Sequence, residues 1–313
     1  MEPVRRAVID IGTNSVKLLV AEVAGGIVTP LTERSEQTRL GKGFYEHHRL
    51  QHEAIAHTAR VVAEFAGAAG ELGASTLRVI ATSAARDAVN APELIAAVRS
   101  TAGVMVEIIS GEQEADWAFQ GVLTMPDLAG EALLILDVGG GSAEFILGHH
   151  GEALFRQSFP LGTVRLMEKQ LAPEPVTAAG LARCREYLRG QIKNEIEPAL
   201  APALARLAGA YVLLVGTGGT TTILARMANQ MTGYERERIE ATRLTRAEIS
   251  ARREQLWGLP LEERRQLTGL PANRADVILF GVLIYETLME HFKFAELRIS
   301  TRGLRYAAVL EPI

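Results

Sequence analysis

Short apolar runs recur along the chain, and each ends in a loop of glycine, serine, threonine or aspartate. Such runs, rich in β-branched residues, are typical of buried strands. The pattern predicts strands at residues 7–12, 77–83, 106–111, 133–141, 211–219 and 297–303. Between them, helical spacing of apolar residues predicts helices, among them residues 53–69 and 273–292. Strands that alternate with helices indicate an α/β protein.

Several helix starts are marked by a side chain that can accept a hydrogen bond, followed three residues later by glutamate or glutamine. We expect such capping boxes at three pairs: Asn90 with Glu93, Ser110 with Gln113, and Thr245 with Glu248. The second pair predicts a helix that begins near Gly111 and carries Glu114 in its first turn.

One segment occurs twice. DIGTNSVKLLV (residues 10–20) aligns without a gap on DVGGGSAEFIL (residues 137–147), so that Asp10 matches Asp137 and Ser15 matches Ser142. In both copies a strand enters a tight D-x-G loop and a second apolar run follows at once. This is the signature of a β-hairpin, whereas a dinucleotide-binding loop would lead into a helix. The repeat predicts a duplicated domain, with one loop from each copy facing a shared cleft.

The length of the chain indicates the number of domains, and its net charge limits the classes of ligand. The 313 residues predict two domains, since one domain takes roughly 100–200 residues. The net charge of −4 argues against general nucleic-acid binding, so an anionic ligand must be held by local features. Residues 234–265 hold 8 arginines but also 7 glutamates, which predicts a solvated helical surface. No apolar run approaches the ~20 residues of a membrane span, so we expect a cytoplasmic protein without a membrane partner.

Three glycine-rich loops are candidates for binding phosphate, because backbone N–H groups can approach an anion where no Cβ intervenes. A plain turn is the alternative for any single loop, but three loops with a duplicated aspartate favour an anion site. The candidate phosphate ligands are Thr13, Asn14, Ser15, Gly139, Gly140, Gly141, Ser142, Gly216, Thr217, Gly218, Gly219 and Thr220. Asp10 and Asp137 are suited to hold Mg²⁺ or its bound water beside phosphate oxygens.

The order and spacing of DxGTNS, DxGGGS and GTGGT are similar to those of the actin/Hsp70/sugar-kinase superfamily. More specifically, the chain resembles the exopolyphosphatase/guanosine pentaphosphate phosphatase family in its short form, over about residues 7–305. The blocks that carry this resemblance are AVIDIGTNSVKLLVAEV, RLGKGF, VIATSAARDAVN, IISGEQEA, LILDVGGGSAEF, FPLGTVRLME and ISTRGLR.

The resemblance implies two actin-like (ribonuclease H-like) α/β domains, each with a mixed sheet flanked by helices, and a cleft between them. We expect the first domain at residues 1–128, completed by a C-terminal segment at about 297–313, and the second at 129–296. A homodimer is also expected.

The block ATSAARDAVN follows a predicted strand, so Thr82, Ser83 and Arg86 are expected at the carboxyl edge of that strand. Two hydroxyls and a guanidinium suit a phosphate oxygen. The alternative is that Arg86 merely pairs with Asp87. For Arg86 the resemblance favours a phosphate contact, whereas for Asn90 we favour the helix cap.

Two glutamates are candidate catalytic residues, together with Asp137. Glu114 in the first helical turn is either a general base for water or a solvated acidic residue that complements the helix dipole, and the resemblance implies the base. Glu144 matches a family position that assists metal or water binding, although it also fits the polar face of a strand. Further phosphate contacts are expected from Arg165, Arg302 and Arg305, and the family pattern is not kept at Asp116, Trp117 and Tyr306.

Taken together, the resemblance implies a Mg²⁺-dependent phosphohydrolase that releases terminal orthophosphate from inorganic polyphosphate. Guanosine pentaphosphate is the second expected substrate. Two alternatives remain: an actin-like small-molecule kinase, and a non-catalytic protein that binds guanosine tetraphosphate.

Overall fold

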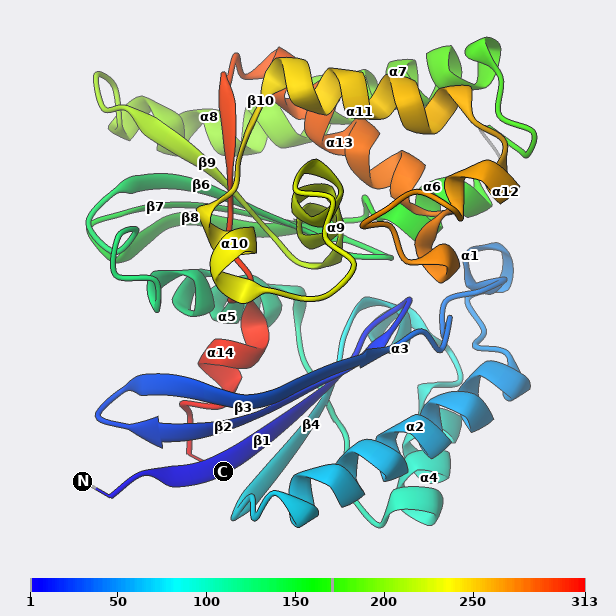
Figure 1. The fold of residues 1–313 in the computed structure, drawn as a ribbon, viewed down its shortest axis with the longest axis vertical. Helices are drawn as coiled ribbons and strands as arrows, with labels where there is room; N and C mark the ends of the chain where they lie inside the picture. Colours follow the sequence, from blue (N-terminus) through cyan, green and yellow to red (C-terminus); the bar gives the residue numbers. More distant parts are fainter. Residues whose placement is uncertain (1, 170–171, 313) are drawn as a thin grey trace. The chain divides into compact units, whose positions relative to one another are not determined.

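The computed structural model describes residues 2–169 and 172–312. The chain forms two compact units, shown as a ribbon in Figure 1. The first unit comprises Met1–Thr124 and Arg302–Ile313, and the second comprises Met125–Thr301. Within the described ranges, the helices are all too short or too polar to cross a membrane.

The first unit is built on a five-stranded mixed sheet in the order β3-β2-β1-β4-β5. β1, β2 and β3 form an antiparallel meander, while β4 is parallel to β1 and β5 is parallel to β4. The strands are β1 Val4–Ile11, β2 Val16–Ala24, β3 Ile27–Glu36, β4 Thr76–Ala81 and β5 Glu107–Ile108.

Helices cover both faces of this sheet because β1 is apolar on both sides. Ala7, Ile9 and Ile11 pack into the core beneath α2 and α4, whereas Val8 packs with residues of α5 and α14. The helices of the first unit are α1 Phe44–His47, α2 His52–Glu71, α3 Ser83–Asp87, α4 Ala91–Ala102, α5 Gly111–Leu123 and α14 Leu304–Ala308. Strand alternation therefore places Asp10 on the same side of the sheet as Val8.

The second unit repeats this plan with six strands in the order β10-β11-β9-β6-β7-β8. β6, β7 and β8 form the antiparallel meander, β9 is parallel to β6, and β11 is parallel to β9. The strands are β6 Ala132–Val138, β7 Ala143–His149, β8 Glu152–Phe159, β9 Val212–Thr217, β10 Arg243–Thr245 and β11 Glu296–Ile299. Two mixed sheets flanked by helices confirm the predicted fold class.

The helices of the second unit surround one hydrophobic core, in which α13 is buried along almost its whole length. They are α6 Thr163–Glu168, α7 Ala178–Gln191, the π-helix η1 Ile192–Ile196, α8 Glu197–Arg206, α9 Gly219–Ala228, α10 Arg236–Ala241, α11 Arg246–Gly258, α12 Leu261–Arg264, the 3₁₀-helix η2 Ala272–Arg274 and α13 Ile278–His291.

Two of the three predicted helix caps are confirmed. The Ser110 hydroxyl accepts a hydrogen bond from the Gln113 N–H at 3.1 Å, and α5 begins at Gly111. Thr245 and Glu248 form a reciprocal capping box at the start of α11. Both caps are local, so the sequence spacing was sufficient to predict them.

The expected capping box at Asn90 is wrong, although Asn90 does stand at the N-cap position of α4. Its Oδ1 accepts from the Leu50 N–H at 2.8 Å, and its Nδ2 donates to the Leu50 carbonyl at 3.1 Å. The backbone of Leu50, distant in sequence, thus occupies the Oδ1 that a helix cap would need, while Nδ2 also donates to Glu93 Oε2 at 3.1 Å.

Several predicted element boundaries also differ, and two of these differences have a clear local cause. The helix expected at 273–292 begins at Ile278, because residues 272–274 form a 3₁₀ turn after Pro271. The strand expected at 106–111 contains only Glu107–Ile108, since Ser110 already caps the next helix.

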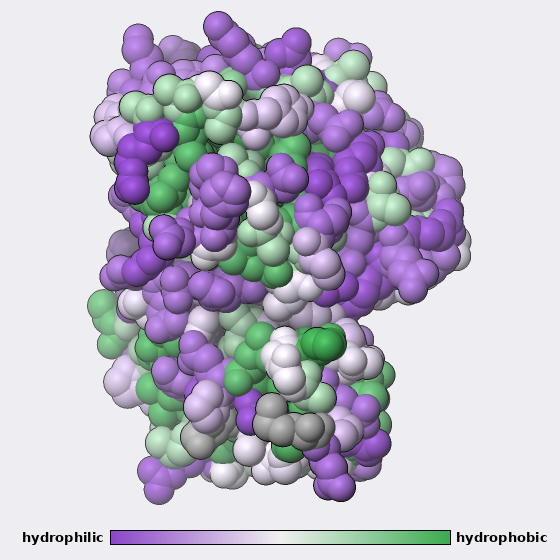
Figure 2. All heavy atoms as spheres, turned by 90° about the vertical axis from the view of Figure 1, so that its left-hand side faces the viewer, coloured by the Kyte–Doolittle hydropathy of each residue, from purple (hydrophilic) through white to green (hydrophobic). Residues whose placement is uncertain are grey.

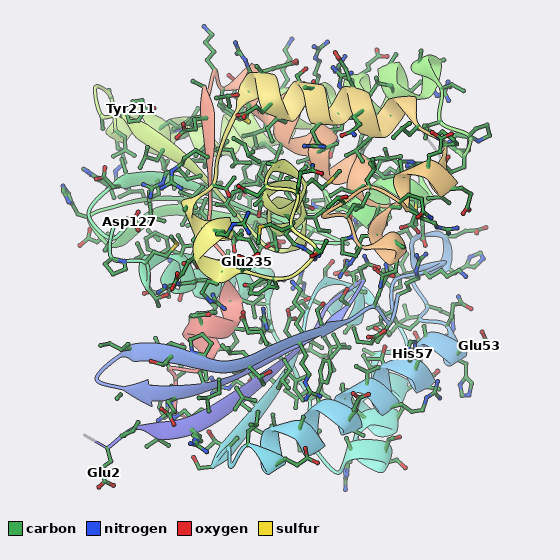
Figure 3. The ribbon with its side chains drawn as sticks, viewed as in Figure 1. Glu2, Glu53, His57, Asp127, Tyr211 and Glu235 are labelled. Carbon is green, nitrogen blue, oxygen red and sulfur yellow. The ribbon has the colours of Figure 1, made fainter. Side chains whose placement is uncertain are left out.

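The mixed-charge stretch is only partly a solvated surface. Glu235, labelled in Figure 3, is exposed and pairs with Arg238 at 2.7 Å. Figure 2 shows hydrophilic side chains spread over one face of the molecule. Arg253, in contrast, donates to the fully buried Glu286 at 3.0 Å. Arg264 is also fully buried and donates to a backbone carbonyl. Sequence alone did not distinguish these arginines, because their partners lie on other elements, 33 and 11 positions further along the chain.

Candidate functional site

The two copies of the internal repeat form the same loop. In the β1–β2 hairpin the Gly12 N–H donates to the Ser15 carbonyl at 3.0 Å, and in the β6–β7 hairpin the Gly139 N–H donates to the Ser142 carbonyl, also at 3.0 Å. An added Cβ would lie 3.1 Å from the serine carbonyl oxygen at Gly12 and 3.2 Å at Gly139. The predicted hairpins are therefore confirmed, and in both loops a glycine lies close to a serine carbonyl at the same place.

Asp10 ends up buried at the carboxyl end of β1, with 5% of its surface exposed. Its Oδ1 has no hydrogen-bond partner among the described residues. Burial raises the pKa of Asp10, and the positive charges of Lys17 and Arg305 lower it by less. A buried carboxylate oxygen without a partner is costly, which is typical of a group that meets a ligand.

The loop after Asp10 is held from outside by the RLGKGF block. The Gly41 N–H donates to the Thr13 carbonyl at 2.7 Å, and the Arg39 N–H donates to the Asn14 carbonyl at 3.0 Å. Gln37 Nε2 donates to Asn14 Oδ1 at 3.0 Å, which leaves Asn14 Nδ2 buried and without a partner in the described part of the chain. Thr13, Asn14 and Ser15 are all buried, and the Asn14 amide offers a donor to an anion.

The FPLGTVRLME block holds the second glycine loop in a similar way. The Val164 N–H donates to the Gly140 carbonyl at 2.9 Å, and Arg165 Nε donates to the Gly141 carbonyl at 2.7 Å. A Cβ at Gly162 would lie 2.3 Å from the Gly140 oxygen, so only glycine permits this packing. Arg165, expected to contact phosphate, is bound to the loop itself.

The third loop lies directly beside Asp137. Asp137 and Thr217 are register partners in the parallel pair β6–β9, and Gly218 follows in a backbone conformation with φ 91° and ψ −164°. A Cβ on Gly218 would lie 2.4 Å from Asp137 Oδ1. Gly219 and Thr220 then begin α9. The structure therefore brings together the candidate metal ligand and the GTGGT loop of the second unit.

Glu144 lies beside Asp137 on the neighbouring strand β7. It is the register partner of Asp137 in the antiparallel β6–β7 pair, and directly opposite residues lie on the same face of the sheet. Glu144 is only 1% exposed, and its Oε1 accepts a hydrogen bond from the Ser158 hydroxyl at 2.7 Å. Glu144 is therefore a buried polar residue of the strand rather than a solvent-exposed one.

In the first unit, Thr82 and Ser83 follow the end of β4, as the sequence predicted, and both are buried. Arg86 lies in the short helix α3, where its Nη1 donates to Glu114 Oε2 at 2.9 Å. The distance from Arg86 Nε to Asp87 Oδ1 is 3.9 Å, so Glu114 rather than Asp87 is the main partner.

Glu114 is 7% exposed, which excludes the interpretation of a solvated helix start. It lies in the first turn of α5, directly after the capped Ser110. A buried carboxylate held by one guanidinium is fixed in orientation and shielded from bulk water. These are properties of a general base that acts on a bound water molecule.

The arginines near the C-terminus bind the protein itself. Arg302 Nη1 donates to the Thr124 carbonyl at 2.7 Å, and Arg305 Nη1 donates to the Leu18 carbonyl at 2.7 Å. The structure thus gives both guanidiniums a role in attaching the C-terminal segment to the first unit.

The departure from the family pattern at Trp117 has a structural explanation. Trp117 is 3% exposed, its Nε1 donates to Glu311 Oε1 at 2.7 Å, and the Arg78 guanidinium lies 5.5 Å from its ring centroid. Tyr306 is also buried and packs in the same cluster. Trp117 is therefore a packing residue of α5 that contacts the C-terminal segment.

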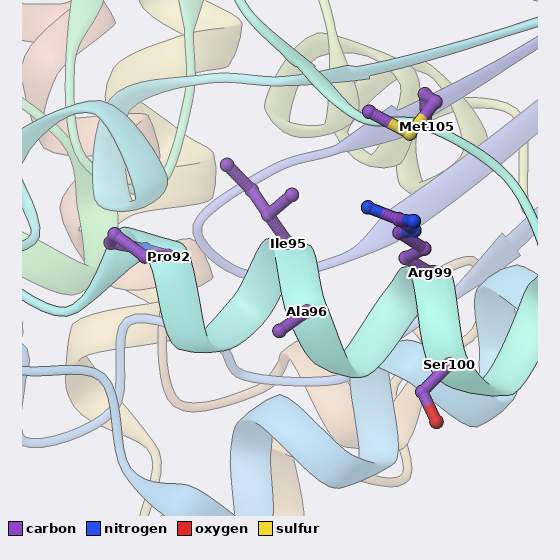
Figure 4. A pocket seen from close by; sticks show the side chains of 6 residues that line it. All are labelled: Pro92, Ile95, Ala96, Arg99, Ser100 and Met105. Carbon is purple, nitrogen blue, oxygen red and sulfur yellow. The ribbon is translucent and has the colours of Figure 1, made fainter.

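A separate hollow lies on the outer side of α4 and has a volume of about 530 Å³ (Figure 4). Its lining is mostly apolar and includes none of the candidate site residues: Pro92, Ile95, Ala96, Arg99, Ser100 and Met105. The described residues also contain no group of three or more histidine, cysteine, aspartate or glutamate side chains that could hold a metal.

Sequence reasoning missed several residues that support the site. Gly162 could have been found from the sequence, since it is the glycine of the FPLGTVRLME block. Ser158 and Gln37 could not, because each forms its hydrogen bond with a side chain that is remote along the chain. Only the fold reveals such partners.

Comparisons with known proteins agree with this architecture. Residues 19–311 match the model of the Ppx/GppA phosphatase family. The chain is 33% identical over 298 residues to Exopolyphosphatase 2 of Mycobacterium tuberculosis, covering 92% of this chain and 91% of that protein. The crystal structure of the Aquifex aeolicus Ppx/GppA family member superimposes with a TM-score of 0.78 at 30% identity, covering 98% of this chain and 96% of that one. An exopolyphosphatase from Cytophaga hutchinsonii gives a TM-score of 0.84 at 25% identity, covering 97% and 96%.

Proposed function

The chain belongs to the Ppx/GppA phosphatase family, and from that premise we propose that it is an exopolyphosphatase that releases terminal orthophosphate from inorganic polyphosphate. The observation that carries the hydrolytic mechanism is the buried Glu114, held by Arg86 at 2.9 Å at the start of α5. The choice of polyphosphate is supported by the similarity to Exopolyphosphatase 2 along nearly the whole chain.

Hydrolysis here requires positioning and one proton transfer. Glu114 accepts a proton from water, whose oxygen forms a bond to the terminal phosphorus. The bond from that phosphorus to its bridging oxygen breaks, and the shortened chain leaves with the electron pair. Arg86 holds one carboxylate oxygen of Glu114, so the carboxylate does not need to reorient during the reaction.

The glycine loops hold phosphate oxygens in this proposal. Their backbone N–H groups and hydroxyls are donors, and the missing Cβ atoms let an anion approach the backbone. The buried Asn14 Nδ2, which lacks a partner within the described ranges, is a further donor in the first unit. In the second unit Gly218 and Thr220 lie beside Asp137 and at the start of α9.

We also propose that Asp10 and Asp137 hold Mg²⁺. The buried Oδ1 of Asp10, which has no partner among the residues that the structure describes, fits a cation, and a cation would offset the cost of burying that charge. Mg²⁺ is typically bound through one or two carboxylates together with waters and substrate phosphates, so a larger carboxylate cluster is not needed. When bound, the ion neutralises the charge that develops on the phosphate oxygens.

Parallel measurements of phosphate release from polyphosphate, guanosine pentaphosphate and ATP, each with Mg²⁺ and with a chelator, test this proposal. Polyphosphate is expected to be the best substrate, and the chelator is expected to abolish release. If only guanosine pentaphosphate is hydrolysed, the enzyme is a guanosine pentaphosphate 5'-phosphohydrolase. Transfer of phosphate from ATP to an acceptor would identify a kinase, and tight binding of guanosine tetraphosphate without any release would identify a non-catalytic binding protein.

Glu114→Gln tests the base, and Glu112→Gln is its matched control, because both residues lie in the first turn of α5 but Glu112 is exposed. Loss of a general base lowers kcat by roughly 10²–10⁴-fold, so we expect this loss for Glu114→Gln alone. Equal activity of the two variants would exclude Glu114 as the base.

A further inference from the structure

Tyr285 is a buried residue of α13 that neither the sequence motifs nor the proposed mechanism uses. It is fully buried, and its hydroxyl donates a hydrogen bond to the Leu136 carbonyl at 2.9 Å. Leu136 directly precedes Asp137 in the central strand β6. The Tyr285 hydroxyl therefore contacts the backbone at the point where β6 enters the second glycine loop.

The same hydroxyl also contacts the third glycine loop. A Cβ on Gly216 would lie 3.0 Å from the Tyr285 hydroxyl oxygen, and Thr221 in the first turn of α9 hydrogen-bonds to Tyr285. Gly216 and Leu136 are register partners in the parallel pair β9–β6. The Tyr285 hydroxyl oxygen thus lies next to the strand ends that lead into both loops, and the absence of a side chain at Gly216 leaves room for it.

The hydroxyl keeps its proton near neutral pH and can act as a donor. Burial raises the pKa of Tyr285 well above its ordinary value, and the negative charge of Asp137 raises it further. A protonated phenol in this place can satisfy a backbone carbonyl that would otherwise lack this bond.

We infer that Tyr285 is a positioning residue that fixes the Asp137 loop and the 216–221 loop relative to each other. This inference rests on the proposed function, because it assigns Tyr285 to the phosphate site through its two neighbouring loops. Tyr285 does not touch the substrate. Its effect is on alignment, since a displacement of about 1 Å in a catalytic group can cost about 100-fold in rate.

Tyr285→Phe tests this inference, with Thr287→Val as a matched control. Thr287 lies in the same helix, is 1% exposed, and donates its hydroxyl to the Leu283 carbonyl at 2.7 Å. Both variants lose one buried hydrogen bond from a hydroxyl to a backbone carbonyl, but only Tyr285→Phe loses it beside the loops. Amide hydrogen exchange of peptides covering residues 137–142 and 216–221 is measured alongside kcat and KM.

For Tyr285→Phe we expect at least several-fold faster exchange in both peptides and a roughly tenfold lower kcat, with KM within about twofold. For Thr287→Val we expect unchanged exchange in these peptides and unchanged kcat. Unchanged exchange in Tyr285→Phe, or equal acceleration in both variants, overturns the inference. If the unmodified protein releases no phosphate from any substrate, the proposed function fails, while the exchange comparison still decides the role of Tyr285.

Discussion

Replacing Gly218 tests whether close packing of the GTGGT loop against Asp137 is needed for stability and activity. Replacement by alanine introduces two costs. The backbone has φ 91° and ψ −164°, a conformation that is essentially confined to glycine and costs other residues about 1–3 kcal/mol. The new Cβ would also lie 2.4 Å from Asp137 Oδ1, so the carboxylate has to move by roughly 1 Å to reach van der Waals contact.

The expected loss of stability is the sum of these two costs. Overpacking adds about 1–3 kcal/mol, so Gly218→Ala is expected to lower the free energy of unfolding by about 2–6 kcal/mol. The displaced Asp137 is expected to lower kcat/KM by about 100-fold. Urea unfolding measures the first effect, and phosphate release from polyphosphate measures the second.

Two other glycines supply the controls. At Gly219 an added Cβ meets no atom within 4 Å, so alanine should not destabilise the same loop. Gly190 in α7 is equally open, and Gly190→Ala should leave phosphate release unchanged and raise stability by about 0.5–1 kcal/mol. The reasoning is refuted if Gly218→Ala unfolds like Gly219→Ala and retains the activity of Gly190→Ala.

Three further predictions concern stability. Because burial raises the pKa of Asp10, Asp10→Asn should raise the free energy of unfolding at pH 7 when no Mg²⁺ is present. This gain should vanish as the pH falls to about 4, where the carboxyl of the unfolded chain also becomes protonated. Urea unfolding across pH checks this, and an unchanged or lower stability at pH 7 contradicts it. Glu286→Leu leaves two arginines without their buried partner and should cost about 3–5 kcal/mol, seen as a lower Tm. Gly121→Ala places a Cβ 2.1 Å from the Gly303 carbonyl oxygen and should likewise lower Tm, whereas an unchanged Tm would show that the C-terminal segment moves aside freely.

Local patterns in the sequence were enough to predict much of the fold. The apolar runs located the main strands, and the spacing of Ser110 and Gln113 located the start of α5. The gapless repeat of Asp10 at Asp137 predicted two equivalent hairpin loops. Hydrophobic periodicity, capping and tight turns act over a few residues, so their signals are complete within a short window of sequence.

Tertiary structure decided which polar groups became partners. It placed Arg86 on Glu114, 28 positions away, and Tyr285 on the carbonyl of Leu136, 149 positions away. Asn90 had the correct spacing for a capping box, but its Oδ1 accepts from the backbone N–H of Leu50, 40 positions away, and caps no helix.

The physical reason is that a buried polar group must find a partner wherever the fold brings one within about 3 Å. The sequence by itself determined the loops, the strands that carry them and the residue types available for phosphate chemistry. Which carboxylate is buried, which guanidinium holds it and which hydroxyl supports the loops depend on packing between elements remote along the chain, and only the folded protein determines these.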